Sequence, residues 1–358
     1  MELSGLEIWL PGTGTKEGNT FCTWYRRITS MRDYKQIREQ LTGGMIPAVP
    51  VPRSADGTIH VEAHENYAKY MAAQRIHGVA LWVHTGRGLQ LTRPEREYVL
   101  RCWRANLGPE QAIVAGSGSL IDPAWKAEER VKRWYASSHE MAADAMNGGA
   151  DALLVFPPVI FRDLPPAERD EAIVAYHQSL ADQGYPLILF YLYEEAGGVN
   201  YTLKVLERLM ELSQVIGIKV ATLDSVMTMQ DISSLMRIHF PDKLLFTGED
   251  RMFGYSLMRG AESALVGLGA AFPNIQADLI QAYRDRRYDQ FMDLSARIDG
   301  FAEAAFVAPM DKYILRMLWC LVLAGVIPEE AAGELAGYEI SQEEIDILRE
   351  AITSNQLY

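Results

Sequence analysis

Apolar runs alternate with amphipathic segments along the chain from residue 44 onward. The runs begin near eight positions, Ile46, Val79, Ile113, Ala152, Leu187, Val215, Leu244 and Ser263. The segments between them carry apolar residues at helical spacing, as in residues 168–182. Buried strands that alternate with amphipathic helices are typical of parallel α/β folds. Eight such units predict a (β/α)8 TIM barrel.

The sequence also marks helix boundaries and the two ends of the barrel. Thr92-Arg93-Pro94-Glu95 has the pattern of a capping box at a helix start. A doubly wound open sheet is the alternative fold, but no GxGxxG follows the first predicted strand. We therefore predict an N-terminal arm over residues 1–43, which contains a short helix at 33–41, the barrel over 44–272, and a C-terminal helical region over 273–358.

Composition narrows the classes of partner. The 358 residues are 49% hydrophobic and 23% charged, as in ordinary globular proteins. A net charge of −13 argues against nucleic acid and against an anionic membrane surface. The three cysteines form no CxxC pair, and the first ten residues lack a basic signal-peptide region. We expect a cytoplasmic protein with no nucleic-acid or membrane partner.

Lys219 is the first candidate for chemistry. It follows the apolar stretch Val215-Ile216-Gly217-Ile218, near the C-terminal end of a predicted strand. Catalytic groups of TIM barrels lie at that end of the strands. An amine among apolar neighbours has a lowered pKa, and a neutral amine can attack a ketone to form a Schiff base. The alternative is a lysine that only extends from the strand end into solvent.

Several motifs together resemble one family. Gly217-Ile218-Lys219-Val220-Ala221-Thr222 resembles the Schiff-base lysine motif of the dihydrodipicolinate synthase/N-acetylneuraminate lyase family. Other stretches agree in order and spacing: Ala48-Val49-Pro50-Val51-Pro52, Ala115-Gly116-Ser117-Gly118, Gly149-Ala150-Asp151-Ala152, Gly248-Glu249-Asp250 and Arg259-Gly260-Ala261. The resemblance implies a lysine-dependent aldolase or dehydratase that acts on pyruvate or another 2-oxo acid, such as a keto-deoxy sugar acid. It also implies a homotetramer or homodimer.

The resemblance assigns a proton-transfer residue and a carboxylate loop. The family's tyrosine falls on Tyr191; a one-residue shift would give Phe190, which has no hydroxyl. The alternative for Tyr191 is an aromatic side chain that packs in the barrel. The carboxylate loop falls on residues 83–87. Thr85 and Gly86 retain a hydroxyl and close backbone amides there.

The same loop and the ends of three later strands give further substrate-binding candidates. His84 and Arg87 replace family residues and add donors, and Arg87 could clamp a second anionic group. The alternative is that Arg87 is a solvated loop residue. The remaining candidates at the seventh and eighth strands are Gly248, Asp250, Arg251 and Leu265, and Glu194 and Glu195 follow the fifth strand.

Two departures limit the resemblance. The second tyrosine of the lysine-biosynthesis synthase falls at Val159, and the arginine that binds the aldehyde in that synthase falls near Ala196. The sequence therefore disfavours that synthase itself, and a non-catalytic protein that binds 2-oxo acids or sugar acids is the alternative. We expect no organic cofactor, because the protonated imine is the electron sink. We expect no metal either, since His60 and His64 have no evident third ligand.

Overall fold

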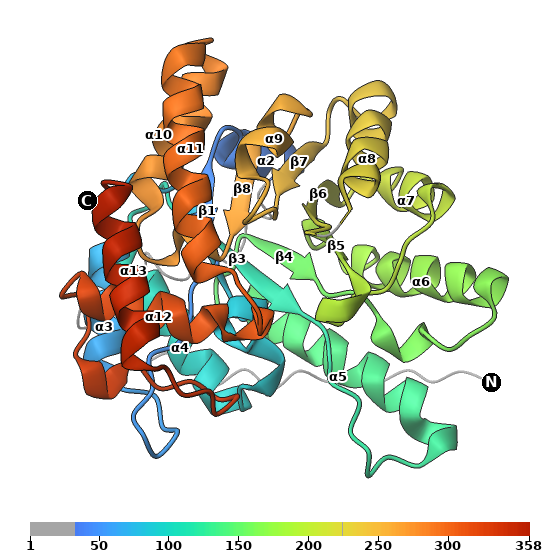
Figure 1. The fold of residues 1–358 in the computed structure, drawn as a ribbon. Coiled ribbons are helices and arrows are strands. Elements are labelled where there is room, and N and C mark those ends of the chain that lie inside the picture. Colours follow the sequence, from blue (N-terminus) through green and yellow to red (C-terminus); the bar gives the residue numbers. More distant parts are fainter. Residues whose placement is uncertain (1–32, 224) are drawn as a thin grey trace, which may run out of the picture. The chain divides into compact units, whose positions relative to one another are not determined.

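The computed structural model of the chain describes residues 33–223 and 225–358 (Figure 1). Residues 1–32 of the predicted arm lie outside the described residues. The strands are buried along their whole length and comprise β1 (Met45–Pro47), β2 (Gly78–Leu81), β3 (Ala112–Ser117), β4 (Ala152–Val155), β5 (Leu187–Leu192), β6 (Val215–Ala221), β7 (Leu244–Thr247) and β8 (Ser263–Val266).

The eight strands form one parallel sheet in the order β1-β8-β7-β6-β5-β4-β3-β2. A parallel bridge between Ala48 and Ala80 brings the first and last strands of this order together, so the sheet curls into a barrel. A helix follows every strand in turn: α3 (Val61–Ala72), α4 (Arg93–Asn106), α5 (Ala127–Asn147), α6 (Pro166–Ala181), α7 (Leu203–Met210), α8 (Val226–His239), α9 (Phe253–Met258) and α10 (Pro273–Arg284). The predicted (β/α)8 barrel is confirmed.

Local sequence signals account for the helix starts. The predicted capping box forms at α4, where the Thr92 side chain accepts from the Glu95 backbone N–H and the Glu95 carboxylate accepts from Thr92. The helix predicted at 33–41 is α2 (Tyr34–Leu41), which begins after the N-cap Asp33. Its Ile37 and Leu41 pack with the apolar residues inside the barrel. Tyr34 donates to the carbonyl of Gly184 just before β5, so α2 covers the end at which the strands begin.

Strand alternation sorts side chains between two cores. Ile188 and Phe190 of β5 belong to the core inside the barrel. Leu189 and Tyr191 belong to the core between the strands and the surrounding helices. Neighbouring residues of a strand face opposite sides, so each strand supplies both cores. A one-residue change of register therefore decides whether a side chain can reach the site.

The chain continues past the barrel in helices α11 (Tyr288–Ala305), α12 (Tyr313–Leu323) and α13 (Gln342–Ser354), with a 3-10 turn η6 (Met310–Lys312) before α12. These helices belong to the same compact unit as the barrel, which spans Asp33–Tyr358 (Figure 1). None of the described helices is both long enough and apolar enough to cross a bilayer. The segment between α11 and α12 turns back to the barrel and becomes part of the site below.

Candidate active site

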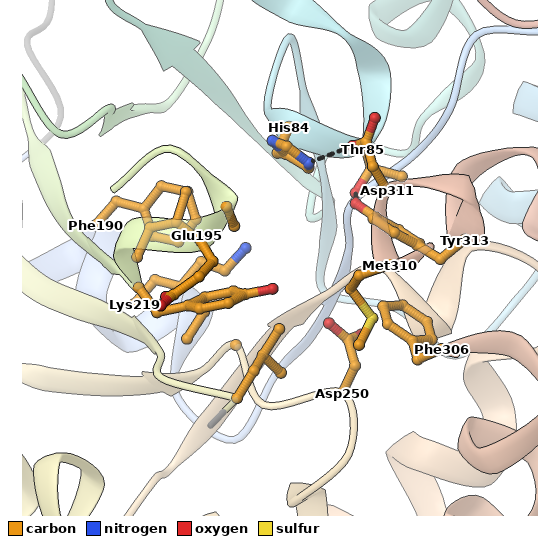
Figure 2. Close-up of a pocket in the computed structure, with 17 residues that line it drawn as sticks. His84, Thr85, Phe190, Glu195, Lys219, Asp250, Phe306, Met310, Asp311 and Tyr313 are labelled. Atoms are coloured by element: carbon orange, nitrogen blue, oxygen red, sulfur yellow. Dashed lines mark hydrogen bonds and ion pairs between the residues drawn. The ribbon is translucent and has the colours of Figure 1, made fainter. Parts of the chain in front are cut away.

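A cavity of about 220 Å³ lies at the C-terminal ends of the strands (Figure 2). Strands β5 and β6, the loops after five strands, and the segment that leads into α12 supply its walls. The lining residues are His84, Thr85, Phe190, Leu192, Tyr193, Glu195, Ala196, Lys219, Ala221, Leu223, Gly248, Asp250, Gly267, Phe306, Met310, Asp311 and Tyr313. The cavity thus occupies the part of a TIM barrel where active sites are found.

Lys219 lies on β6 directly opposite Phe190 of β5 in the parallel register. Its side chain is 7% exposed, and its Nζ lies 4.4 Å from the centroid of the Phe190 ring. Burial lowers the pKa of Lys219 to about 8, although the nearby carboxylates of Asp250 and Glu249 oppose this shift. The amine therefore loses its proton at lower pH than an ordinary lysine, and its neutral form is the nucleophile.

Two neighbours on the loop after β7 fix the position of Lys219. A Cβ on Gly248 would lie 2.6 Å from Lys219 Cε, so the glycine leaves the space that the lysine chain occupies. The buried Glu249 carboxylate accepts the backbone N–H groups of Thr222 at 2.6 Å and Leu223 at 2.9 Å, and the Thr222 hydroxyl at 2.8 Å. These bonds hold the chain immediately after β6, and with it the strand end that carries the amine.

Asp250 supplies a buried carboxyl group to the same cavity. One of its oxygens accepts the backbone N–H of Leu268 at 2.7 Å. Burial raises the pKa of Asp250 to about 7, while that hydrogen bond and the Lys219 ammonium oppose the rise. The carboxyl and the amine therefore titrate in the same pH range and influence each other.

The opposite wall comes from the loop after β2 and from the segment before α12. The hydroxyl oxygens of Thr85 and Tyr313 lie 2.8 Å apart, and a His84 ring nitrogen lies 3.1 Å from Asp311 (Figure 2). The Tyr313 ring stacks on Phe306 with ring centroids 4.4 Å apart. Figure 2 shows the Lys219 amine directed into the space that Thr85, Asp250 and Tyr313 face.

Five of the predicted site residues line this cavity: Lys219, His84, Thr85, Gly248 and Asp250. Gly86 is buried beside it but is not a lining residue; a Cβ there would lie 2.9 Å from the Val49 carbonyl oxygen. Glu195 lines the cavity, whereas Glu194 does not. The structure brings the predicted groups together, and their chemical roles remain predictions.

Tyr191 does not line the cavity, which corrects the position expected for it. Strand alternation directs its ring into the core between strands and helices, where its hydroxyl donates to Asn200 Oδ1 at 3.0 Å. The neighbouring Phe190 faces Lys219 instead. The one-residue shift that the sequence left open thus places a ring without a hydroxyl beside the amine.

Three other substrate-binding candidates also lie outside the cavity lining. Arg87 is held by Asp311 at 2.7 Å and by Glu334 at 3.1 Å, so its guanidinium is neither solvated nor free to clamp a substrate anion. Arg251 donates to the carbonyl of Phe306 at 3.0 Å. Leu265 packs in the core inside the barrel, because its strand position points it there.

Sequence reasoning missed the residues that the C-terminal region contributes. Phe306, Met310, Asp311 and Tyr313 all line the cavity, although they follow the barrel in sequence. They lie in or beside apolar helical patterns, and no local signal indicates that this segment returns to the strand ends.

His60 and His64, the two histidines weighed as metal ligands, have other roles in the structure. The described part of the chain holds no group of three or more His, Cys, Asp or Glu side chains arranged to bind a metal ion. His64 is buried and accepts a hydrogen bond from Trp103 Nε1 at 2.9 Å, whereas His60 caps the start of α3. This histidine pair therefore serves packing and capping.

Comparison with known proteins gives the family. Residues 41–331 match the model of the dihydrodipicolinate synthetase family. An uncharacterized DapA-like lyase of Chloroflexus aurantiacus is 26% identical over 246 residues, covering 67% of this chain and 74% of the relative. The N-acetylneuraminate lyase of Mediterraneibacter gnavus is 25% identical over 256 residues, covering 71% of this chain and 72% of the relative.

A solved structure supports the fold independently. A monomeric dihydrodipicolinate synthase variant superimposes with a TM-score of 0.76 at 18% identity, covering 89% of this chain and 99% of that one. Because the family model spans most of the sequence and includes the strand that carries Lys219, the resemblance seen in the motifs is confirmed. The chain belongs to the dihydrodipicolinate synthetase family.

Proposed function

We propose that the protein is a lysine-dependent lyase in which Lys219 forms a Schiff base with pyruvate or another 2-oxo acid. The observation that carries this proposal is the buried Lys219 amine, which faces the cavity at the strand ends and has a pKa lowered to about 8. Family membership supports a lyase or aldolase activity. Relatives named N-acetylneuraminate lyase and 4-hydroxy-tetrahydrodipicolinate synthase point in the same direction.

The chemistry follows from a neutral amine that is buried in the site. The Lys219 amine attacks C2 of the 2-oxo acid, and the resulting carbinolamine loses water to give a protonated imine. That imine withdraws electrons from the neighbouring carbon, so either a C3 proton or a C3–C4 bond can leave its electron pair behind as an enamine. Loss of a proton serves condensation or dehydration, and loss of the carbon bond is aldol cleavage.

The lining suggests how a substrate is held. His84 and Thr85 offer polar groups for the oxo-acid carboxylate. Among the described lining residues, no arginine faces the remainder of the substrate, because Arg87 is bound by Asp311 and Glu334. Apolar side chains form much of the rest of the wall, including Leu192, Leu223, Phe306 and Met310. We propose that the remainder of the substrate carries no second negative charge.

Reductive trapping tests the Schiff base. Incubation with pyruvate and borohydride is expected to add one reduced three-carbon unit, located at Lys219 by peptide mapping, and Lys219→Ala should abolish it. Lys243→Arg is the matched control, since burial also lowers the pKa of Lys243, but this lysine donates to backbone carbonyls outside the cavity. Wild-type protein that gains no adduct with pyruvate or with a panel of longer 2-oxo acids would contradict the proposal.

One observation favours a second candidate. Phe190 faces Lys219, and Val159 stands at the position of the second tyrosine. Neither brings a hydroxyl, as expected for a protein that binds 2-oxo acids or sugar acids without turnover. The Lys219→Ala variant of such a protein would still be stabilised against heat by the ligand. Loss of that stabilisation in Lys219→Ala would favour the lyase.

A further inference from the structure

We propose that Tyr313 is the catalytic residue that transfers protons at the Lys219 imine, with Thr85 as its hydrogen-bonded partner. This inference rests on the proposed Schiff-base chemistry. The side chain opposite Lys219 on β5 is Phe190, and the Tyr191 hydroxyl lies on the other side of that strand. A hydroxyl that serves the imine must therefore come from another element.

Tyr313 has the geometry for that role. It begins α12, is 7% exposed and lines the cavity, with its hydroxyl oxygen 2.8 Å from that of Thr85. Figure 2 shows its hydroxyl and the Lys219 amine facing the same space. Thr85 and Tyr313 thus form a pair of exchangeable hydroxyls inside the site, although they are far apart in sequence.

The surroundings hold the Tyr313 ring in place. Phe306 stacks on one side, with 4.4 Å between ring centroids and 23° between ring planes. The His84 ring is stacked near it with centroids 6.3 Å apart. A Cβ on Gly267 would lie 2.7 Å from the Tyr313 ring, so only glycine leaves room for this orientation. A hydroxyl fixed in this way is preorganised for proton transfer.

Tyr313 gives up one proton and regains one from the substrate within a single catalytic cycle. The Tyr313 O–H gives its proton to the hydroxyl that leaves the carbinolamine, so water departs and the Lys219 nitrogen forms the protonated imine. The resulting phenolate then takes a proton from C3, which leaves its electron pair in the enamine and restores Tyr313. The net change is ketone plus amine to enamine plus water. Burial raises the pKa of Tyr313, so the group begins each cycle as a neutral phenol.

Asp250 and Tyr193 are among the other lining residues that can carry an exchangeable proton. Asp250 already accepts the Leu268 backbone N–H, and the rise of its pKa to about 7 leaves it partly charged near neutral pH. Tyr193 lies on the loop after β5. Tyr313 is favoured by the second hydroxyl, that of Thr85, which lies within hydrogen-bond distance of its own inside the cavity.

Exchange of the pyruvate methyl protons in D2O tests the role without knowledge of the natural substrate. Wild-type protein is expected to catalyse the exchange through the enamine, as followed by proton NMR. Tyr313→Phe should slow it by about 100-fold or more, the usual contribution of a proton-transfer group. Cyanoborohydride should still trap the Lys219 adduct in this variant. Tyr191→Phe is the matched control, expected to exchange as wild type does.

The outcomes separate this inference from the proposed function. If the wild-type protein forms no adduct, both proposals are wrong. If Tyr313→Phe forms the adduct and exchanges methyl protons at the wild-type rate, only the role of Tyr313 is wrong. If Tyr193→Phe is the only variant that loses exchange, the role belongs to Tyr193. If Tyr313→Phe does not fold, Thr85→Val breaks the hydroxyl pair from the other side. Its exchange should fall about 10-fold and that of Thr85→Ser should not, whereas unchanged exchange in Thr85→Val overturns the inference.

Discussion

At the scale of the residue, the site depends on a buried amine and a buried carboxyl group that share one cavity. Burial lowers the pKa of Lys219 to about 8 and raises that of Asp250 to about 7. Burial disfavours the charged form of each group, whereas their mutual attraction favours both charges. The neutral amine that the chemistry requires therefore becomes abundant as the pH rises past neutrality.

The rate of Lys219 trapping should report this titration. With pyruvate in the wild-type protein, the initial rate of adduct formation is expected to rise with pH and level off above a midpoint of about 8. Asp250→Asn removes a carboxylate that raises the pKa of Lys219, so the midpoint should move to lower pH. Mass spectrometry of timed, quenched samples measures both profiles. A midpoint that moves to higher pH would contradict the coupling.

Gly248 leaves the space that the Lys219 side chain occupies, which is a second feature at the scale of the residue. A Cβ on Gly248 would lie 2.6 Å from Lys219 Cε, so Gly248→Ala must displace the amine. We expect the trapping rate to fall by about 100-fold, because small displacements of a reacting group are costly. Gly108→Ala is the control, since a Cβ there meets its nearest neighbour at an ordinary 3.6 Å. Equal trapping by both variants would contradict this role of Gly248.

At the scale of the element, the segment before α12 and the loop after β2 together form one wall of the cavity. His84 contacts Asp311 and Thr85 contacts Tyr313, so the C-terminal region belongs to the site. Arg87 connects the same two regions through Asp311 and Glu334. Its ion pairs are therefore expected to stabilise the fold.

Loss of the Arg87 cation should destabilise the protein. The Arg87 side chain is 9% exposed and that of Glu334 is 2% exposed, so Arg87→Gln leaves a buried carboxylate without its partner. We expect the free energy of unfolding to fall by about 3 kcal/mol. Urea denaturation measures it, and Arg133→Gln serves as control because the exposed ion pair of Arg133 with Glu129 should contribute under about 1 kcal/mol. Equal stability of both variants would argue against a structural role.

The elements also show what could be predicted from the sequence. The strand that ends near Lys219 and the capping box at Thr92 are local patterns, and both formed as expected. The position expected for Tyr191 was wrong because adjacent strand positions face opposite cores, so an error of one residue in register exchanges them. Tyr313 had no local signal, because its contact with Thr85 joins segments that lie 228 residues apart in sequence.

At the scale of the whole molecule, the candidate site draws residues from both ends of one compact unit. Lys219 on β6 and Tyr313 on α12 belong to the same unit, which spans Asp33–Tyr358. The position that the resemblance gives to a second tyrosine is Val159, which has no hydroxyl. We propose that the protein assembles as a homotetramer or homodimer and that each subunit supplies its own proton-transfer hydroxyl.

Subunit mixing tests whether this hydroxyl acts within one chain. Lys219→Ala and Tyr313→Phe subunits, co-expressed with different affinity tags and purified as mixed oligomers, should not regain methyl-proton exchange. Each active site would still lack one of the two groups. Light scattering gives the oligomeric state of the same samples. Recovery of a quarter or more of the wild-type rate in the mixed oligomers would mean that Tyr313 serves a neighbouring subunit.

The most direct measurement of the central claim is a crystal structure of the protein soaked with pyruvate. The account predicts continuous electron density from Lys219 Nζ to C2 of pyruvate, with the bound molecule inside the cavity between Thr85, Asp250 and Tyr313. Pyruvate bound there with clear separation from Nζ, or a fully occupied pyruvate elsewhere and an empty cavity, would contradict a Schiff base at Lys219.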